Sequence, residues 1–514
     1  MKKTRRMLVL CLAMAVALGT LFSGCAPKIK DTEDFLEIQL LEVGVGRTFL
    51  DKIIEEYNKE YPEIEVHVSP SNAYGVFDTT ITGGPDTTTY DLYIASTGNF
   101  KRVLDMEGDY ILDLSSVIDE IPEGQSRSIR QRLNKQYKDN FTFDGEKMYT
   151  LPWQAAAHGL VYNKKWFDAN GIELPLTSDH LLEICDTIVG KGKTPFIGNM
   201  YNYWAYVYEG WWAQYQGVSE YFNFWQAKDA LGNQPSQLAW AQQGRLEALE
   251  VMQEILSFDE QGRYKYVVEG SNTTTHTEAQ TKFLNEVAVM TPNASWLETE
   301  MRADWTGELD VRLMRLPVIS SILEVLPKKS VTTDTQLREV VKYIDDRREG
   351  LDVQKPAYAH DEDIARIEEA RNVVFTTQAM GVCIPSYAKA VEAAKDFVQF
   401  MYSDVGLKIM AEEFVFMPAV EFDNPANAPD ITKWSTFAQS CADVHSTANY
   451  IFNPVTYPLF YRNGDALAFQ SYPELTLGAT NPDDRLSASE FYKRDQQIVA
   501  SKWKNWMSAA GLEE

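Results

Sequence analysis

Cysteine and histidine are scarce in this sequence, and their scarcity excludes several kinds of site. Only five of the 514 residues are cysteines, and two of them, Cys11 and Cys25, lie near the N-terminus. The other three are odd in number and far apart, so no disulfide framework is predicted: Cys185, Cys383 and Cys441. The six histidines are dispersed, and none has metal-ligand spacing with another. We therefore expect no bound metal.

Common catalytic and cofactor motifs are also missing. No HExxH or GxSxG sequence occurs. Gly44 and Gly46 begin like a dinucleotide-binding loop, but Phe49 stands where the third glycine is required. His158 lies in an apolar stretch of small residues and is interpreted as a structural imidazole. We expect no cofactor and no enzymatic activity, with a glycoside hydrolase that uses two of the many carboxylates as the alternative.

Positive charge is in deficit along the chain. There are 48 basic against 74 acidic residues, which gives a formal net charge of −26. A body with this charge repels nucleic acid, anionic lipid and anionic ligands from a distance. We therefore expect no nucleic-acid partner and a neutral ligand.

The N-terminus has the pattern of an export signal. Basic residues precede an apolar run, residues 7–18, that is too short to be a comfortable membrane span. The sequence Ser23-Gly24-Cys25 then looks like a bacterial lipobox, although Phe22 replaces the usual leucine. We expect residues 1–24 to be a lipoprotein signal peptide, Cys25 to carry the acyl chains, and residues 25–34 to form a tether. This predicts a lipid-anchored protein on the extracytoplasmic face of the bacterial cell membrane.

Strand and helix patterns alternate after the tether. Residues 36–41 alternate like a strand, residues 49–57 place apolar side chains on one helical face, and residues 64–68 alternate again. This order predicts an α/β fold with a largely parallel sheet. Ligands of such sheets bind beyond the carboxyl ends of the strands. The loops near Ser96 and Asn293 therefore become candidate binding regions.

Two later segments are unusual in composition. Residues 201–225 are rich in tyrosine, tryptophan and phenylalanine, and we expect about half of these rings in the core and the rest along a cleft. Residues 317–371 are highly charged and are interpreted as a solvated helical insertion, with a partner-docking surface as the alternative.

Four segments together resemble the family 1 extracellular solute-binding proteins of ABC importers, which include the maltodextrin-binding proteins. They span nearly all of the chain after the tether. They are FLDKIIEEYNKEYPEIEVHV with the following YDLYIASTGNFKRVLDMEGDYILDLSSVI, FTFDGEKMYTLPWQAAAHGLVYNKKWFDANGI, FLNEVAVMTPNASWLETEM, and MGVCIPSYAKAVEAAKDFVQFMYSDVGLKIM.

The resemblance implies two α/β lobes joined by a hinge around a central ligand cleft, as in periplasmic binding proteins. Lobe 1 is expected to hold residues 35–152 and 312–418, with the charged insertion at about 317–371. Lobe 2 is expected to hold residues 153–311 and 419–514. The implied function is the capture of a carbohydrate, an oligosaccharide by preference, by a monomer that delivers it to the ABC permease subunits. A receptor of the same fold for a non-sugar solute or a sensor kinase is a further alternative.

The resemblance also suggests site residues. In the maltodextrin-binding proteins a tryptophan in the segment matching Trp296 belongs to the sugar platform, and Asn293 is placed to bond hydroxyl groups. A sugar ring is amphipathic, so its C–H face lies on an aromatic plane while its hydroxyls need hydrogen-bond partners. The same resemblance suggests further binding residues in three other segments. They are Tyr201 and Trp204 of the aromatic segment, Ser96 and Asn99 after the third strand, and Tyr457 in the sequence NPVTYPLFY.

Three further candidates come from their places next to the expected cleft. Trp153 follows the Leu151-Pro152 crossing near the hinge. Glu42 and Arg47 flank the loop after the first strand and could supply charge-assisted hydrogen bonds. The alternative is a core position for Trp153 and a solvated one for the two charged residues.

Overall fold

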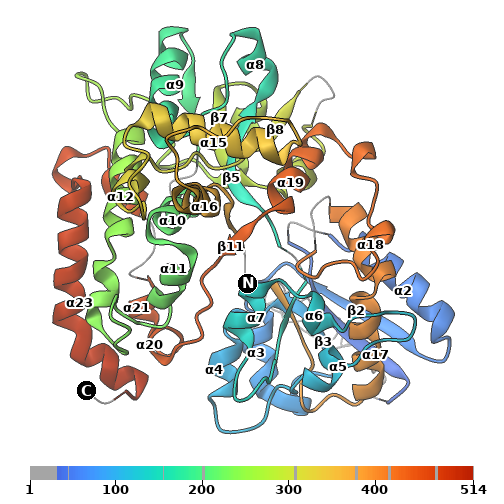
Figure 1. The fold of residues 1–514 in the computed structure, drawn as a ribbon. Helices are drawn as coiled ribbons and strands as arrows, with labels where there is room; N and C mark the ends of the chain where they lie inside the picture. The colour runs from blue at the N-terminus through green and yellow to red at the C-terminus, as the bar shows by residue number, and fades with distance from the viewer. Residues whose placement is uncertain are drawn as a thin grey trace, which may run out of the picture.

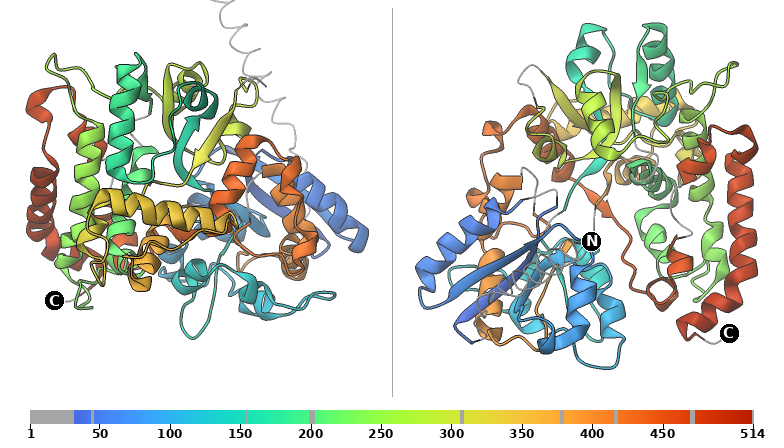
Figure 2. Two further views of the ribbon diagram at one scale, coloured as in Figure 1. Left: turned by 45° about the horizontal axis from the view of Figure 1, so that its top comes forward. Right: turned by 180° about the vertical axis from the view of Figure 1, so that it is seen from behind.

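The computed structural model describes residues 32–43, 46–153, 155–198, 203–305, 309–376, 380–414, 418–468 and 473–512. These residues form two lobes, each built on its own β-sheet. Lobe 1 lies at the lower right of Figure 1, and lobe 2 lies above it and continues down the left side. The two views in Figure 2 agree that the blue N-terminal elements and the red C-terminal helix lie on opposite sides of the molecule.

The sheet of lobe 1 has the strand order β2-β1-β3-β10-β4. Its first three strands are parallel, and β10 runs antiparallel between β3 and β4. All seven residues of the inner strand β1 are buried, because helices cover both faces of the sheet. The bounds are β1 (Phe35–Leu41), β2 (Glu65–Ser71), β3 (Leu92–Ser96), β4 (Leu151–Pro152) and β10 (Met380–Cys383).

The sheet of lobe 2 has the order β11-β9-β5-β7-β6, and β8 also pairs with β5. The central strand β5 is antiparallel to β7, β8 and β9, so this sheet is mixed, whereas the sequence predicts a largely parallel one. The bounds are β5 (His158–Asn163), β6 (Thr194–Phe196), β7 (Ala288–Ala294), β8 (Val311–Met314), β9 (Val373–Phe375) and β11 (Asn449–Ile451).

Helices cover both sheets. Those of lobe 1 are α2 (Thr48–Glu60), α3 (Val76–Thr80), η1 (Ile81–Asp86), α4 (Phe100–Leu104), α5 (Ser115–Asp119), α6 (Ile129–Arg132), α7 (Lys135–Phe141), α17 (Val391–Met401) and α18 (Asp404–Phe414). The helix α2 forms where the sequence predicts it, because Phe49, Leu50, Ile53 and Tyr57 all face the core.

Lobe 2 holds the longer helices. They are α8 (Lys164–Ala169), α9 (Ser178–Gly190), α10 (Tyr203–Gln216), α11 (Val218–Phe224), η2 (Gln237–Ala241), α12 (Gln243–Ile255), α13 (His276–Leu284), α14 (Leu297–Glu300), η3 (Ser320–Glu324), α15 (Asp334–Arg348), α16 (Asp361–Arg371), α19 (Thr436–Ser446), α20 (Pro458–Tyr461), α21 (Gly464–Ala468), α22 (Pro473–Leu477) and α23 (Ala488–Ala510). The short turns η4 (Pro425–Asn427), η5 (Ile431–Lys433) and η6 (Pro482–Asp484) complete the set. Among the described residues, no helix is both long and apolar enough to cross a membrane.

The chain passes between the lobes in three places. It leaves lobe 1 between β4 and β5, returns between β9 and β10, and leaves again between α18 and α19. The first crossing lies between Pro152 of β4 and His158 of β5. The second lies near residue 376, so the charged residues 317–371 belong to lobe 2 rather than to lobe 1 as expected. The reason is that β8 pairs with β5 and β9 pairs with β11, which fixes both ends of this segment on the second sheet.

The charged segment is anchored in lobe 2 by its apolar face and by a largely buried ion pair. The helix α15 buries Leu337, Val340, Val341 and Ile344, while Lys342 and Arg347 are exposed. Arg371 of α16 donates to Asp345 at 2.7 Å and to the carbonyl of Leu316 at 3.0 Å. These contacts indicate that the charged segment is an integral part of the surface of lobe 2.

The aromatic segment is almost entirely core. In α10 and α11 the rings of Trp211, Trp212 and Tyr221 are buried, and Trp212 packs edge-on against Tyr221 with centroids 4.9 Å apart. Among the described rings of residues 203–225, only Tyr206 is partly exposed. The expectation that half of these rings line a cleft therefore does not hold, because α10 is packed between the sheet, α12 and α16.

Candidate ligand-binding cleft

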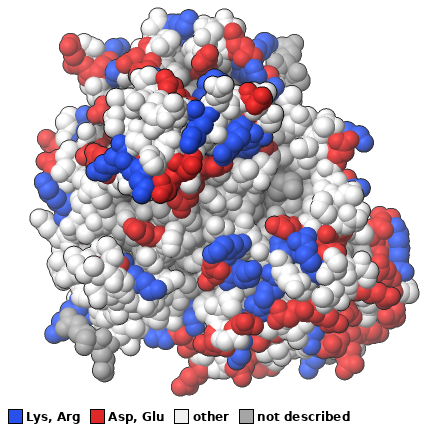
Figure 3. All heavy atoms as spheres, in the orientation of Figure 1, with Lys and Arg blue, Asp and Glu red and all other residues white. Residues whose placement is uncertain are grey.

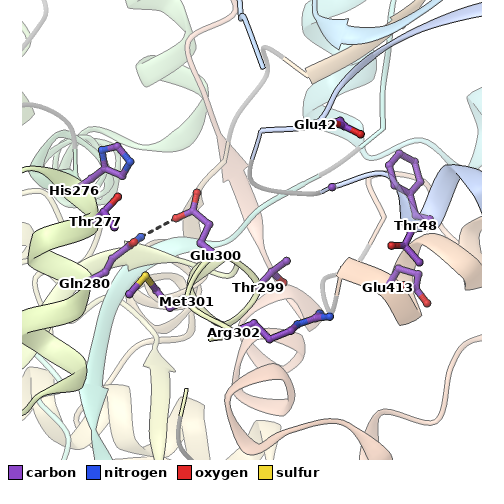
Figure 4. A pocket seen from close by; sticks show the side chains of 12 residues that line it. Glu42, Thr48, His276, Thr277, Gln280, Thr299, Glu300, Met301, Arg302 and Glu413 are labelled. Carbon is purple, nitrogen blue, oxygen red and sulfur yellow. Dashed lines mark hydrogen bonds between the residues drawn. The ribbon is translucent and has the colours of Figure 1, made fainter. Parts of the chain in front are cut away.

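A cavity of about 530 Å³ lies between the two lobes. Lobe 1 contributes the end of β1, the first turn of α2 and the end of α18, and lobe 2 contributes α13 and α14 (Figure 4). Its lining is Glu42, Gly46, Thr48, Phe49, His276, Thr277, Gln280, Thr299, Glu300, Met301, Arg302 and Glu413. A hollow of this size and position is typical of a small-molecule site at a domain junction.

The polar groups of the cavity are partly fixed by their neighbours. Gln280 Nε2 donates to Glu300 Oε2 at 2.8 Å, as the dashed line in Figure 4 shows. Glu413 is paired with Lys52 behind the wall. Carboxylates, amides and hydroxyls are therefore gathered around one space, and carboxylates accept hydrogen bonds from ligand hydroxyl groups.

An aromatic cluster stands beside the cavity on lobe 2. Trp296 caps α14, three residues before Thr299 of the lining, and is partly exposed. Its ring meets His158 edge-on with centroids 4.6 Å apart, and the ring of Tyr203 lies 6.5 Å away. Trp296 does not itself line the cavity, but it forms part of the adjoining surface where β7 ends and α14 begins.

His158 holds this cluster to the sheet. Its Nδ1 donates to the carbonyl of Phe375 at 3.0 Å and contacts that of Ala156 at 3.2 Å. Burial lowers the pKa of His158 to about 3, so the imidazole is neutral. The ring therefore ties β5 to β9 at the crossing between the lobes, and it supports Trp296 from behind.

Asn293 lies inside lobe 2 at the end of β7. Its side chain is 1% exposed, and its Oδ1 accepts from the amide of Ala294 at 2.8 Å. Its Nδ2 has no hydrogen-bond partner among the described residues. A buried donor of this kind costs about 1–3 kcal/mol when unsatisfied, so a hydroxyl that reached it would be bound favourably.

Two of the expected aromatic residues are core residues. Trp204 is 0% exposed and packs edge-on against Phe196 with centroids 5.4 Å apart. Trp153 is also buried, and it stacks on Phe49 at 5.6 Å with the planes 7° apart. Trp204 thus has no surface for a ligand, whereas Trp153 backs a residue of the cavity wall.

The remaining expected residues are spread along both lobes. Ser96 and Asn99 are partly exposed at the end of β3, where Asn99 Nδ2 donates to Asp78 at 2.8 Å. Tyr457 is partly exposed at the start of α20. Arg47 is exposed and pairs with Asp51 at 2.8 Å. Of the expected residues only Glu42 lines the cavity, and Tyr201 and Cys25 lie outside the described residues.

Most of the cavity lining and one facing aromatic residue were not predicted from the sequence. His276 and Thr277 start α13, and Gln280 lies one turn further on. The sequence signal for this helix is the capping box formed by Thr275 and Glu278. Tyr74, between β2 and α3, is 54% exposed, which is unusual for so large a ring. The pKa of its hydroxyl is raised, first by desolvation of that group and then by the Glu300 carboxylate. Tyr74 of lobe 1 is therefore within electrostatic range of Glu300 of lobe 2.

The pKa of Tyr203 in lobe 2 is affected by groups of both lobes. Burial raises the pKa of Tyr203, and the nearby Glu300 and Tyr74 raise it further. Tyr74 and Tyr203 are therefore within electrostatic range of the same Glu300 carboxylate. Aromatic planes and hydrogen-bonding groups from both lobes are the combination that an amphipathic ligand requires.

Solved structures share this fold over almost their whole length. RafE from Streptococcus pneumoniae in its apo form has a TM-score of 0.60 at 16% identity, covering 93% of this chain and 99% of that one. RafE in complex with raffinose has a TM-score of 0.57 at 16% identity, covering 90% and 99%. The two-lobed α/β fold expected from the sequence is therefore confirmed.

Sequence comparison gives the family. The multiple sugar-binding protein of Streptococcus mutans is 23% identical over 257 residues, which cover 48% of this chain and 54% of that protein, about half its length. Residues 43–408 match the family described as bacterial extracellular solute-binding protein. That match extends over both lobes and over all of the cavity lining except Glu42 after β1 and Glu413 at the end of α18. This chain therefore belongs to the bacterial extracellular solute-binding protein family.

Proposed function

We propose that the protein captures a carbohydrate, an oligosaccharide by preference, in the cleft between its lobes. The observation that carries this proposal is the cavity of about 530 Å³ with Glu42 on one lobe and the Gln280–Glu300 pair on the other. Partly exposed Trp296 and exposed Tyr74 offer apolar ring faces next to these polar groups. A sugar presents both kinds of surface, which supports this class of ligand.

The proposal extends to delivery and anchoring. The protein passes its ligand to the transmembrane subunits of an ABC importer, as the family membership and the sugar-binding relatives support. We propose that it does so as a monomer. Lobe closure around the ligand retains it until transfer, because both lobes contribute to the site. Acyl chains on Cys25 hold the protein at the extracytoplasmic face of the membrane.

A glycan panel tests the carbohydrate proposal. We expect one class among raffinose, maltodextrins, xylo-oligosaccharides and chito-oligosaccharides to raise the melting temperature. A ligand at a hundred times its Kd stabilises by about 2.7 kcal/mol. With that ligand the radius of gyration from X-ray scattering should fall, because open molecules shift to the closed state.

Two outcomes of this test would contradict the proposal. Stabilisation by none of the glycans would exclude these carbohydrates as ligands. Recovery of shortened sugar chains after incubation would indicate a glycoside hydrolase instead of a binding protein, and chromatography of the sugar detects it directly.

The anchor has its own test. In the Cys25→Ala variant we expect the protein to leave the membrane fraction and to bind the same glycan with unchanged affinity. The reason is that β1, the first described strand of lobe 1, begins at Phe35, ten residues after the proposed attachment point. A variant that stays in the membrane fraction, or one that is released but unfolded, would contradict the proposed layout.

A further inference from the structure

A second cavity, of about 690 Å³, lies at the third crossing between the lobes. No described residue lines both this hinge cavity and the cleft. One wall is residues 418–422, which pair with lobe 1 through Leu133 and Val420 and through Asn134 N to Ala419 O at 3.2 Å. The opposite wall is α19 and β11 of lobe 2, and α19 is tied to β8 by Ser440 Oγ, which accepts from Leu313 N at 2.9 Å. One wall is therefore attached to lobe 1 and the other belongs to lobe 2. This explains why the two walls do not pack against each other as tightly as residues of one core.

The lining of the hinge cavity is mainly apolar. Its buried surface comes from small and medium side chains on both walls: Ala419, Val420, Phe422, Pro429 and Ala442. At its rim Ile431 is 40% exposed, which leaves apolar surface in contact with water. Figure 3 shows that the surface between the lobes is mostly uncharged on this face, whereas acidic side chains gather at the lower right edge, over α2 and α17. The driving force for an occupant is therefore apolar burial.

The charged groups of the lining are already paired. Arg127 Nη1 contacts Glu421 at 3.1 Å, its Nε lies 3.5 Å from Asp423, and its Nη2 donates to the carbonyl of Phe422 at 2.7 Å. These pairs leave no reason for the occupant to carry a charge, since an added ion would have to displace one of them.

One buried polar atom of the lining is unsatisfied. His445 is 7% exposed, and its Nδ1 pairs with the hydroxyl of Tyr450 at 2.5 Å. Its Nε2 has no hydrogen-bond partner among the described residues. Burial lowers the pKa of His445 to about 3, with smaller contributions from His158 and Arg315, so the ring is neutral. In a neutral ring Nε2 is a donor or an acceptor according to the tautomer, and a hydroxyl group can satisfy either.

We propose that the hinge cavity is a binding site for a small, uncharged, mainly apolar molecule that carries one hydroxyl group, with His445 as its hydrogen-bond partner. Its volume lies within the range of about 300–1,000 Å³ that is usual for small-molecule sites. This site is separate from the carbohydrate cleft and does not depend on the proposed function.

Calorimetric titration of the full chain with 2-naphthol tests the site, because this probe is apolar and has a single hydroxyl. We expect saturable binding to the unmodified protein. The Ala442→Trp variant fills the cavity from α19 and should bind about tenfold more weakly or not at all. The Ile431→Ala variant removes apolar contact at the exposed rim, where folding is little affected, and should bind about fivefold more weakly.

Two more variants identify the partner atom and the location. His445→Phe keeps a ring but removes both nitrogens, Nε2 and the Nδ1 that pairs with Tyr450, and should weaken binding by about two- to tenfold. Trp296→Ala alters the cleft surface and should leave 2-naphthol binding unchanged. Absence of saturable binding would overturn the proposal. So would equal binding by the unmodified, Ala442→Trp and Ile431→Ala proteins, or a loss of binding caused by Trp296→Ala.

Discussion

Replacing Trp296 with alanine is expected to weaken carbohydrate binding far more than it weakens folding. Trp296 is partly exposed where β7 meets α14, and it rests edge-on against His158. Loss of its apolar contact with a sugar ring should cost about 1–3 kcal/mol of binding free energy. That corresponds to an affinity about five- to two-hundred-fold lower, measured by calorimetry with the glycan that the panel identifies.

Trp204 supplies a matched control for this experiment. It is the same residue type in the same lobe, but it is 0% exposed and packs against Phe196. Trp204→Ala should therefore cost about 3–5 kcal/mol of folding free energy, measured by denaturant unfolding, as is usual for a large core ring. A Trp296→Ala protein that loses this much stability yet binds sugar with full affinity per folded molecule would show that Trp296 is a core residue.

The second large effect concerns pH and two buried carboxyl groups of lobe 2. Burial, with a smaller contribution from the neighbouring Glu209, raises the pKa of Glu474 to about 8. Burial likewise raises the pKa of Glu209 to about 7, although hydrogen bonds from Tyr221 and Asn453 favour its ionised form. Neither carboxylate oxygen of Glu474 has a hydrogen-bond partner among the described residues. Both groups therefore resist ionisation in the folded state.

Stability should fall as the pH rises from 7 to 9. The unfolded chain has already lost both protons in this range, while the folded chain must release them as the pH passes about 7 and about 8. Each protonated group contributes stability that is fully present below its ordinary pKa. This stability is lost as the pH rises from the ordinary pKa to the raised pKa of the folded state. His158 and His445 act in the opposite direction, since burial lowers their pKa values from 6.5, but their effect is confined to lower pH.

The Glu474→Gln variant isolates this effect. Its free energy of unfolding relative to the unmodified protein should rise by about 1.4 kcal/mol between pH 7 and pH 9, because one titration step per molecule is removed. Chemical denaturation at both pH values measures the difference. Glu260→Gln, at an exposed turn, is the control and should show no such change. Parallel pH curves for Glu474→Gln and the unmodified protein would contradict an uncharged Glu474.

Local patterns in the sequence were enough to predict the fold and the family. The apolar face of α2 and the alternating strands β1 and β2 can be recognised from neighbouring residues alone, because their periods of 3.6 and 2 are local properties. The same holds for the β7–α14 segment around Trp296, whose resemblance to a known family rests on adjacent residues. The mixed direction of the lobe 2 sheet was not predictable in this way, since strand pairing joins residues far apart in the chain.

Membership of the two lobes and the composition of the cleft were decided by the tertiary structure. Residues 317–371 read as a charged insertion, yet β8 and β9 pair into the second sheet and place them in lobe 2. Trp204 and Trp296 both adjoin apolar segments, and only packing shows that the first is enclosed by the lobe while the second keeps surface beside the cleft. Glu42, Gln280 and Glu413 meet at one cavity although more than a hundred residues separate each from the next. The sequence alone determined the helices and strands and the family of the protein. Which tryptophans are buried, and which polar residues meet at the cavity, was set by contacts between distant segments, which no local pattern encodes.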